Sequence, residues 1–250
     1  MSNHTSLSNH WLMRLQKAYR QPISESPFYA NLADARSMDD LQWIRQMYYL
    51  SCDFTAAVAL RYGSCLDSRF RDIFGEHAAE EVTHPHDLAV WMREFGFLAT
   101  GEEPTSVPPS LETLAYGGYF IRSVIREPIC HQVITLNLMV EGMASDLFSA
   151  VNPKLAELGL TPTGYWKVHE KADIKHQTLG LDLIPHHEPD SLVGSWYARI
   201  AWEVASLARN ELDSWCGIPR ELRQNLPLPQ DLISQGKLSY SCADTYDAGG

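Results

Sequence analysis

The chain has 250 residues, of which 45% are hydrophobic and 20% are charged, a composition typical of a globular protein. The formal net charge of -11 argues against nucleic-acid binding, which needs a concentrated basic surface. We expect no membrane span, because no uncharged apolar run reaches about 18 residues, and no secretory signal at the N-terminus. The five dispersed cysteines, without a C-x-x-C pair, favour reduced thiols and a cytoplasmic protein.

In the first half of the chain, apolar residues recur at helical spacing. The pattern predicts a helix over residues 8–20, then a proline-punctuated connection. Ser37 is a suitable N-cap for a second helix that ends near Gly63. A third helix is predicted from Leu66 to Phe95, with a kink or break at Pro85.

Residues 101–110 form the clearest loop, and helical patterns resume after them. Helices are predicted over residues 111–127 and 129–151, followed by turns at 152–154 and 161–164. Two more helices are predicted over residues 163–184 and 190–215, the latter capped by Asp190 or Ser191. The result is an all-α bundle of about seven helices over residues 1–225, with a loosely ordered tail over 226–250.

Two segments carry the same spacing of side chains that bind metals. His77, Glu81 and His84 read H-x3-E-x2-H, and His169, Asp173 and His176 read H-x3-D-x2-H. Steps of three, four and seven residues return to nearly the same face of a helix, so each triplet directs two imidazoles and a carboxylate one way. Together with a carboxylate from another helix, such triplets are typical of a non-heme iron pair in a bundle core.

Glu141 supplies that further carboxylate, inside the apolar run ITLNLMVEGMASDLF. A buried carboxylate needs a cation, either a metal or an arginine such as Arg122 or Arg126. Glu80 is an alternative to Glu81, and His77 is either a ligand, a group behind the ligands, or neither. The triplet over residues 169–176 could instead be a solvated polar helix face, because KVHEKADIKH is rich in charges. Six nitrogen and oxygen ligands favour two iron or manganese ions over zinc.

These elements resemble the heme-oxygenase-like diiron oxidases and oxygenases, within a wider thiaminase-like and pyrroloquinoline-quinone-synthase-like group. The resemblance covers about residues 25–215, including LQWIRQMYYLSCDF (41–54) and HPHDLAVWMREFGF (84–97). It implies a heme-oxygenase-like bundle that binds two Fe(II) ions and uses O2. The ligands it implies are Glu81, His84, Glu141, His169, Asp173 and His176.

Within that set, the resemblance gives catalytic roles to Glu81, Glu141 and Asp173, with Glu81 or Glu141 as the bridge between the irons. A further carboxylate that many members carry has no counterpart here, because Gln46 and Met47 stand at the corresponding positions.

The resemblance implies an oxidation in specialised metabolite biosynthesis. Its substrate would be a small molecule, most plausibly an amino acid or amine. Desaturation, C–C fragmentation and N-oxygenation all occur in the family. Arg122, Arg126 and Arg199 could clamp a substrate carboxylate, or could form surface ion pairs.

Two other functions remain open from the sequence. One is a cofactor-free thiaminase-type hydrolase with Cys130 as nucleophile and Glu203 as base. The other is a non-catalytic helical binding protein. Bundles of this kind often form homodimers, but no interface signature is evident.

Overall fold

Helices make up nearly all of the regular structure in the computed structural model of the protein. It describes residues 10–235, apart from the side chains of His10 and residues 170–174. No strand occurs within that range, which confirms the all-α prediction. The α-helices are α1 (His10–Ser24), α2 (Pro27–Asp34), α3 (Ile44–Ser64), α4 (Ser68–Glu81), α5 (His84–Glu94), α6 (Leu111–Arg126), α7 (Ile129–Gln132), α8 (Gly142–Glu157), α9 (Tyr165–His176), α10 (Leu192–Trp215) and α11 (Pro229–Ser234). Shorter 3-10 turns are η1 (Met38–Leu41), η2 (Pro104–Ser106), η4 (Leu181–Leu183) and η5 (Arg220–Leu222), whereas η3 (Val133–Glu141) is π-helical.

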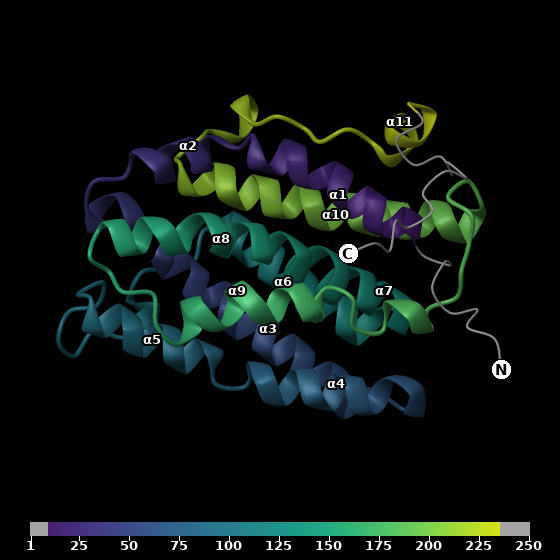
Figure 1. Ribbon diagram of the computed structural model, residues 1–250, viewed down its shortest axis with the longest axis horizontal. Coiled ribbons are helices and arrows are strands. Elements are labelled where there is room, and N and C mark those ends of the chain that lie inside the picture. Colours follow the sequence, from purple (N-terminus) through teal and green to yellow (C-terminus); the bar gives the residue numbers. More distant parts are fainter. Residues whose placement is uncertain (1–9, 236–250) are drawn as a thin grey trace, which may run out of the picture.

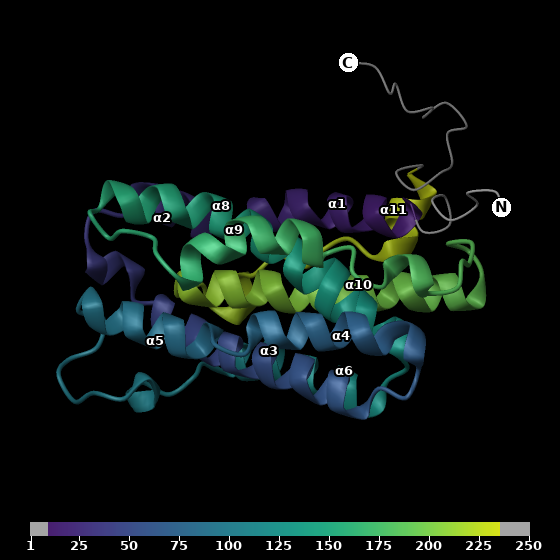
Figure 2. The ribbon, with the colours of Figure 1, turned by 60° about the horizontal axis from the view of Figure 1, so that its bottom comes forward.

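The long helices run roughly along the longest axis of the molecule (Figure 1). Helix α1 packs beside α10, and α10 also packs against α6 and η3. On the other side α3 contacts α4, α5 and α6, whereas α8, which contacts α9, lies on the side of α1 and α2 (Figure 2). The core between these helices is formed by apolar side chains from almost every element. No helix within residues 10–235 is long and apolar enough to cross a membrane.

The break predicted at Pro85 is present. Helix α4 ends at Glu81, and α5 begins at His84 with Pro85 in its first turn, where a missing N–H costs nothing. The prediction that His77, Glu81 and His84 share one helical face is therefore wrong in detail. His84 still reaches Glu81, but it does so across a change of helix direction.

Two other segments differ from the sequence prediction. The predicted connection after residue 20 contains α2, whose start is fixed by Ser26 accepting a hydrogen bond from the Phe28 amide, and by Pro27. The predicted turn at 152–154 is helical, because α8 continues through Pro153 to Glu157.

The predicted tail begins later than expected. Leu226 and Leu232 are buried, so the chain packs against the bundle as far as α11. Residues 236–250 lie outside the described part of the chain.

The most buried helical stretch is the continuous helix formed by α7, η3 and α8. Every residue of η3 except Val140 is buried, and Glu141 is its last residue. π-Helical turns add a residue to the helical repeat and often occur at functional sites. Here the π-helical segment ends at Glu141, whose side chain is buried in the core.

Candidate metal centre

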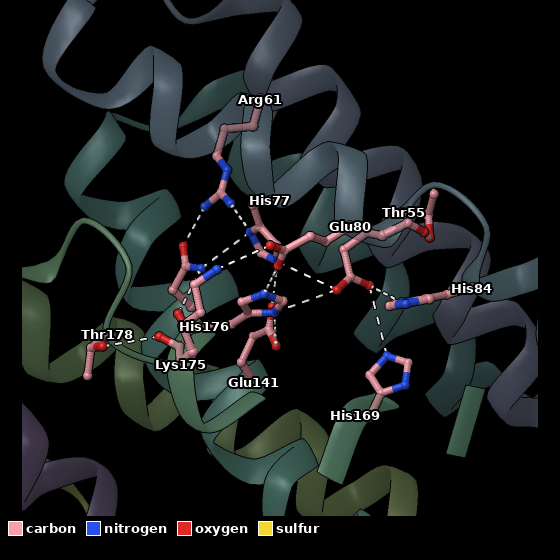
Figure 3. Close-up of polar contacts among 12 residues, drawn as sticks. Thr55, Arg61, His77, Glu80, His84, Glu141, His169, Lys175, His176 and Thr178 are labelled. Carbon is pink, nitrogen blue, oxygen red and sulfur yellow. Dashed lines mark hydrogen bonds and ion pairs between the residues drawn. The ribbon is translucent and has the colours of Figure 1, made fainter. Parts of the chain in front are cut away.

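Six metal-competent side chains from four helical elements meet inside the bundle, each less than a tenth exposed. Figure 3 shows the four imidazoles converging around buried carboxylates. The residues are His77 and Glu81 of α4, His84 of α5, Glu141 of η3, and His169 and His176 of α9.

Glu81 divides this cluster into two ligand groups. His77, Glu81, Glu141 and His176 offer ligand atoms within 4.8 Å of one another, and Glu81, His84 and His169 form a second such group. Glu81 Oε1 lies 3.7 Å from His176 Nδ1, whereas Glu81 Oε2 lies 2.5 Å from His84 Nδ1 and 3.9 Å from His169 Nε2. Each oxygen of Glu81 therefore faces a different group, as a carboxylate bridging two metal ions would.

Four buried atoms on the Glu141 side make no hydrogen bond of acceptable geometry. They are His77 Nε2, Glu81 Oε1, Glu141 Oε1 and His176 Nδ1. Orphaned polar atoms are rare in folded proteins, and a buried carboxylate without a cation is costly. Their convergence fits a site for a metal ion.

Partners outside the cluster hold two of the imidazoles in orientations suited to binding metal. His169 Nδ1 donates to the Tyr165 carbonyl at 2.6 Å, which leaves Nε2 towards Glu81. His176 Nε2 contacts the Glu80 carboxylate, which leaves Nδ1 towards Glu141 at 3.4 Å. Imidazoles that bind metals commonly donate their second N–H in this way. Glu80, predicted as an alternative ligand, therefore contacts the nitrogen of His176 that faces away from Glu141.

His77 is held differently. Arg61 Nη2 donates to His77 Nδ1 at 2.8 Å, and Arg61 Nη1 donates to Asn137 Oδ1 at 2.7 Å. A guanidinium can only donate, so His77 Nδ1 must accept and Nε2 carries the proton of the neutral ring. That nitrogen lies 2.6 Å from Glu141 Oε1. In this tautomer His77 Nε2 holds its proton beside Glu141, although outside hydrogen-bond geometry, and offers no lone pair to a metal ion.

The electrostatics of the cluster favour a bound cation. Burial acts to raise the pKa of Glu141, but His176 and His77 hold it below its ordinary value. Burial acts to lower the pKa of His176, yet Glu141 and Glu80 raise it to about 9. Burial lowers the pKa of His169. Without metal, a proton on His176 balances the buried carboxylates, and a metal ion would displace that proton.

Asp173, the remaining predicted ligand, lies in α9 between His169 and His176. Its side chain is outside the described part of the structure, so its role stays a prediction.

An apolar cavity adjoins the cluster, with roughly 790 Å³ of free space including its mouth. Glu81, Glu141 and His169 form part of its wall, beside aromatic side chains such as Phe120 and Phe148. A mostly apolar and aromatic lining with a few polar groups is typical of a site for a small organic molecule.

The three arginines predicted to clamp a substrate carboxylate do not line this cavity. Arg122 pairs with Glu127, and Arg199 pairs with Glu203 beside a second cavity. Arg126 is exposed. Arg122 and Arg199 therefore form the surface ion pairs that were the alternative prediction, and a role for the three arginines in substrate binding stays a prediction.

The pair predicted for a hydrolase is not found at the first cavity either. Glu203 lines the second cavity, where it accepts a hydrogen bond from the Tyr119 hydroxyl at 2.8 Å. Cys130 lines neither of these two cavities.

Sequence reasoning missed Glu211 of α10, which is buried and lines the first cavity. A signal was available, because Val204, Ala208 and Glu211 follow at steps of four and three residues on one apolar face.

Comparisons with known proteins agree with this geometry. A crystal structure of a TenA homolog from Pseudomonas syringae pv. tomato superposes with a TM-score of 0.67 at 11% sequence identity, covering 84% of this chain and 92% of that chain. That likeness shows a shared fold. A search of curated proteins finds no match. Residues 41–205, more than half of the chain, match the family described as iron-containing redox enzymes. The chain therefore belongs to this family of iron-containing redox enzymes, and it shares its all-α fold with the TenA homolog.

Proposed function

We propose that the protein is a non-heme diiron enzyme that uses O2 to oxidise a small organic molecule. The observation that carries the proposal is the position of Glu81, with one oxygen towards His176 and the other towards His84 and His169. Zinc would not need two carboxylates and this many imidazoles, whereas paired iron sites in helical bundles are built from such residues.

The residues divide between two proposed ions. Glu141, His176 and one oxygen of Glu81 would hold the first, and His84, His169 and the other oxygen of Glu81 would hold the second. Asp173 is a further ligand implied by the resemblance. Two Fe(II) ions held there would supply the electrons that reduce O2 and make substrate oxidation possible.

The protein's own groups prepare the site for that chemistry. The apolar wall limits the access of water, and Phe148 stacks on the His169 ring at 4.6 Å between centroids. His77 holds a proton at Nε2 against Glu141, a position suited to steadying that carboxylate. Desaturation, C–C fragmentation and N-oxygenation of an amine or amino acid all fit these groups.

Anaerobic iron titration tests the proposal. We expect the wild-type protein, stripped of metal and titrated with Fe(II), to bind about two ions per chain and then to consume O2. The His176→Ala variant should lose iron and O2 consumption together. His186→Ala is the matched control, since His186 pairs with Glu188 away from the cluster. No iron in the wild type, or two irons and full O2 consumption in His176→Ala, would refute the assignment.

A further inference from the structure

Glu211 is a buried carboxylate with only one of its two oxygens engaged. Only 1% of the Glu211 surface is exposed to solvent. Thr113 Oγ1 and Trp215 Nε1 donate to Glu211 Oε1 at 2.7 and 2.8 Å, which fixes the carboxylate in place. Oε2 makes no hydrogen bond. An acceptor left unpaired in the interior is costly, so this atom calls for a donor that the chain itself does not provide.

Among the described residues, none donates a hydrogen bond to Glu211 Oε2. Glu211 lines the same cavity as Glu81, Glu141 and His169, and the lining residues, all in the described part of the chain, include no lysine or arginine. The arginine that influences Glu211 is Arg223, and its guanidinium is engaged by Glu112 at 2.8 Å.

Aromatic rings complete the wall near Glu211. Trp215 stacks on Trp43 at 4.9 Å between ring centroids and with 19° between planes, so the Trp215 donor is rigidly placed. Tyr116 lines the cavity on the facing helix α6. A carboxylate beside aromatic side chains is a favourable environment for an organic cation with an apolar body.

We infer that Glu211 is an ammonium-binding subsite, and that the molecule bound in this cavity carries a protonated amine and an apolar body. The inference rests on the proposed function, in which oxidation takes place at the other end of the cavity, where Glu81 and His169 lie. It narrows the substrate class to amines. A free carboxylate on the substrate would meet three acidic side chains and no basic clamp in the cavity.

Ligand binding to the metal-free protein at about pH 8, above the pKa of about 7 that burial gives Glu211, tests the inference. The probes are hexylamine, 1-hexanol and hexanoate, which share an alkyl chain and differ in the charge of the head group. Binding is followed by tryptophan fluorescence, because Trp215 lines the cavity. We expect hexylamine to bind about tenfold or more tightly than 1-hexanol to the wild-type chain, since a charged hydrogen-bonded pair replaces a neutral one.

Two variants separate Glu211 from general electrostatics. Glu211→Gln should lose the preference for hexylamine over 1-hexanol, while its affinity for 1-hexanol stays within about twofold. Glu203→Gln removes a carboxylate from the same helix but from the other cavity, and should retain the preference.

Three outcomes would overturn the inference. They are equal binding of amine and alcohol, a preference that survives in Glu211→Gln, or tightest binding of hexanoate. Equal binding of amine and alcohol by the wild-type chain would overturn the inference even if the Glu211→Gln variant does not fold. Because no metal is present, the result is independent of whether the iron titration succeeds.

Discussion

Replacing Glu211 by Gln should stabilise the metal-free protein at neutral and alkaline pH. Burial raises the pKa of Glu211 to about 7 from 4.5, although hydrogen bonds from Thr113 and Trp215 act in the opposite direction. Because the folded state binds this proton more tightly, its contribution to stability is present in full below pH 4.5 and is lost as the pH rises through about 7. The interval from 4.5 to about 7 corresponds to roughly 3 kcal/mol at about 1.4 kcal/mol per pH unit.

A glutamine side chain keeps an oxygen for Thr113 and Trp215 but does not titrate, so the variant avoids this loss. Urea unfolding of both proteins, with chelator present, measures the free energy of unfolding between about pH 5 and pH 8. All other titrations cancel in the difference. The advantage of Glu211→Gln over the wild type should grow by roughly 3 kcal/mol across this range, or roughly 6–12 °C in Tm. A difference that is the same at both ends of the range would refute the reasoning.

Three further predictions concern the metal cluster and the surface. Glu80→Gln weakens the acceptor on His176 Nε2, and should lower Fe(II) affinity about 10–100-fold in a metal titration while leaving the fold intact. His77→Gln can still accept from Arg61 and keep an N–H beside Glu141, so iron counting should find the wild-type stoichiometry; loss of one ion would show that His77 is a ligand. Arg122→Ala and Arg199→Ala remove ion pairs whose arginine side chains are 64% and 72% exposed, and should change the free energy of unfolding by less than about 1 kcal/mol, with iron binding unaltered.

The sequence by itself determined the helices and the supply of metal-competent side chains. Apolar periodicity depends only on neighbours along the chain, so it located the last long helix. The types of the flanking residues left its cap open between Asp190 and Ser191, of which Ser191 is the cap, and indicated the break near Pro85. The spacing of seven residues between His169 and His176 placed both on one helix.

Only the tertiary structure decided which of these side chains meet. Periodicity cannot fix how one helix is rotated against another, so the sequence left Glu141 with a choice between a metal and an arginine. Packing places Glu141 against His77 and His176, and leaves Arg122 paired with Glu127 at the surface.

The protonation of His77 and the hydrogen bonding of Glu211 also depend on contacts that the tertiary structure creates. The proton on His77 Nε2 is set by Arg61 of α3, a neighbour that no spacing pattern connects with it. The unpaired oxygen of Glu211 exists because Thr113 and Trp215 both engage the other oxygen, from two different helices. Hydrogen-bond partners and burial of this kind are properties of the packed bundle, whereas the sequence carries only the side chains that can take part.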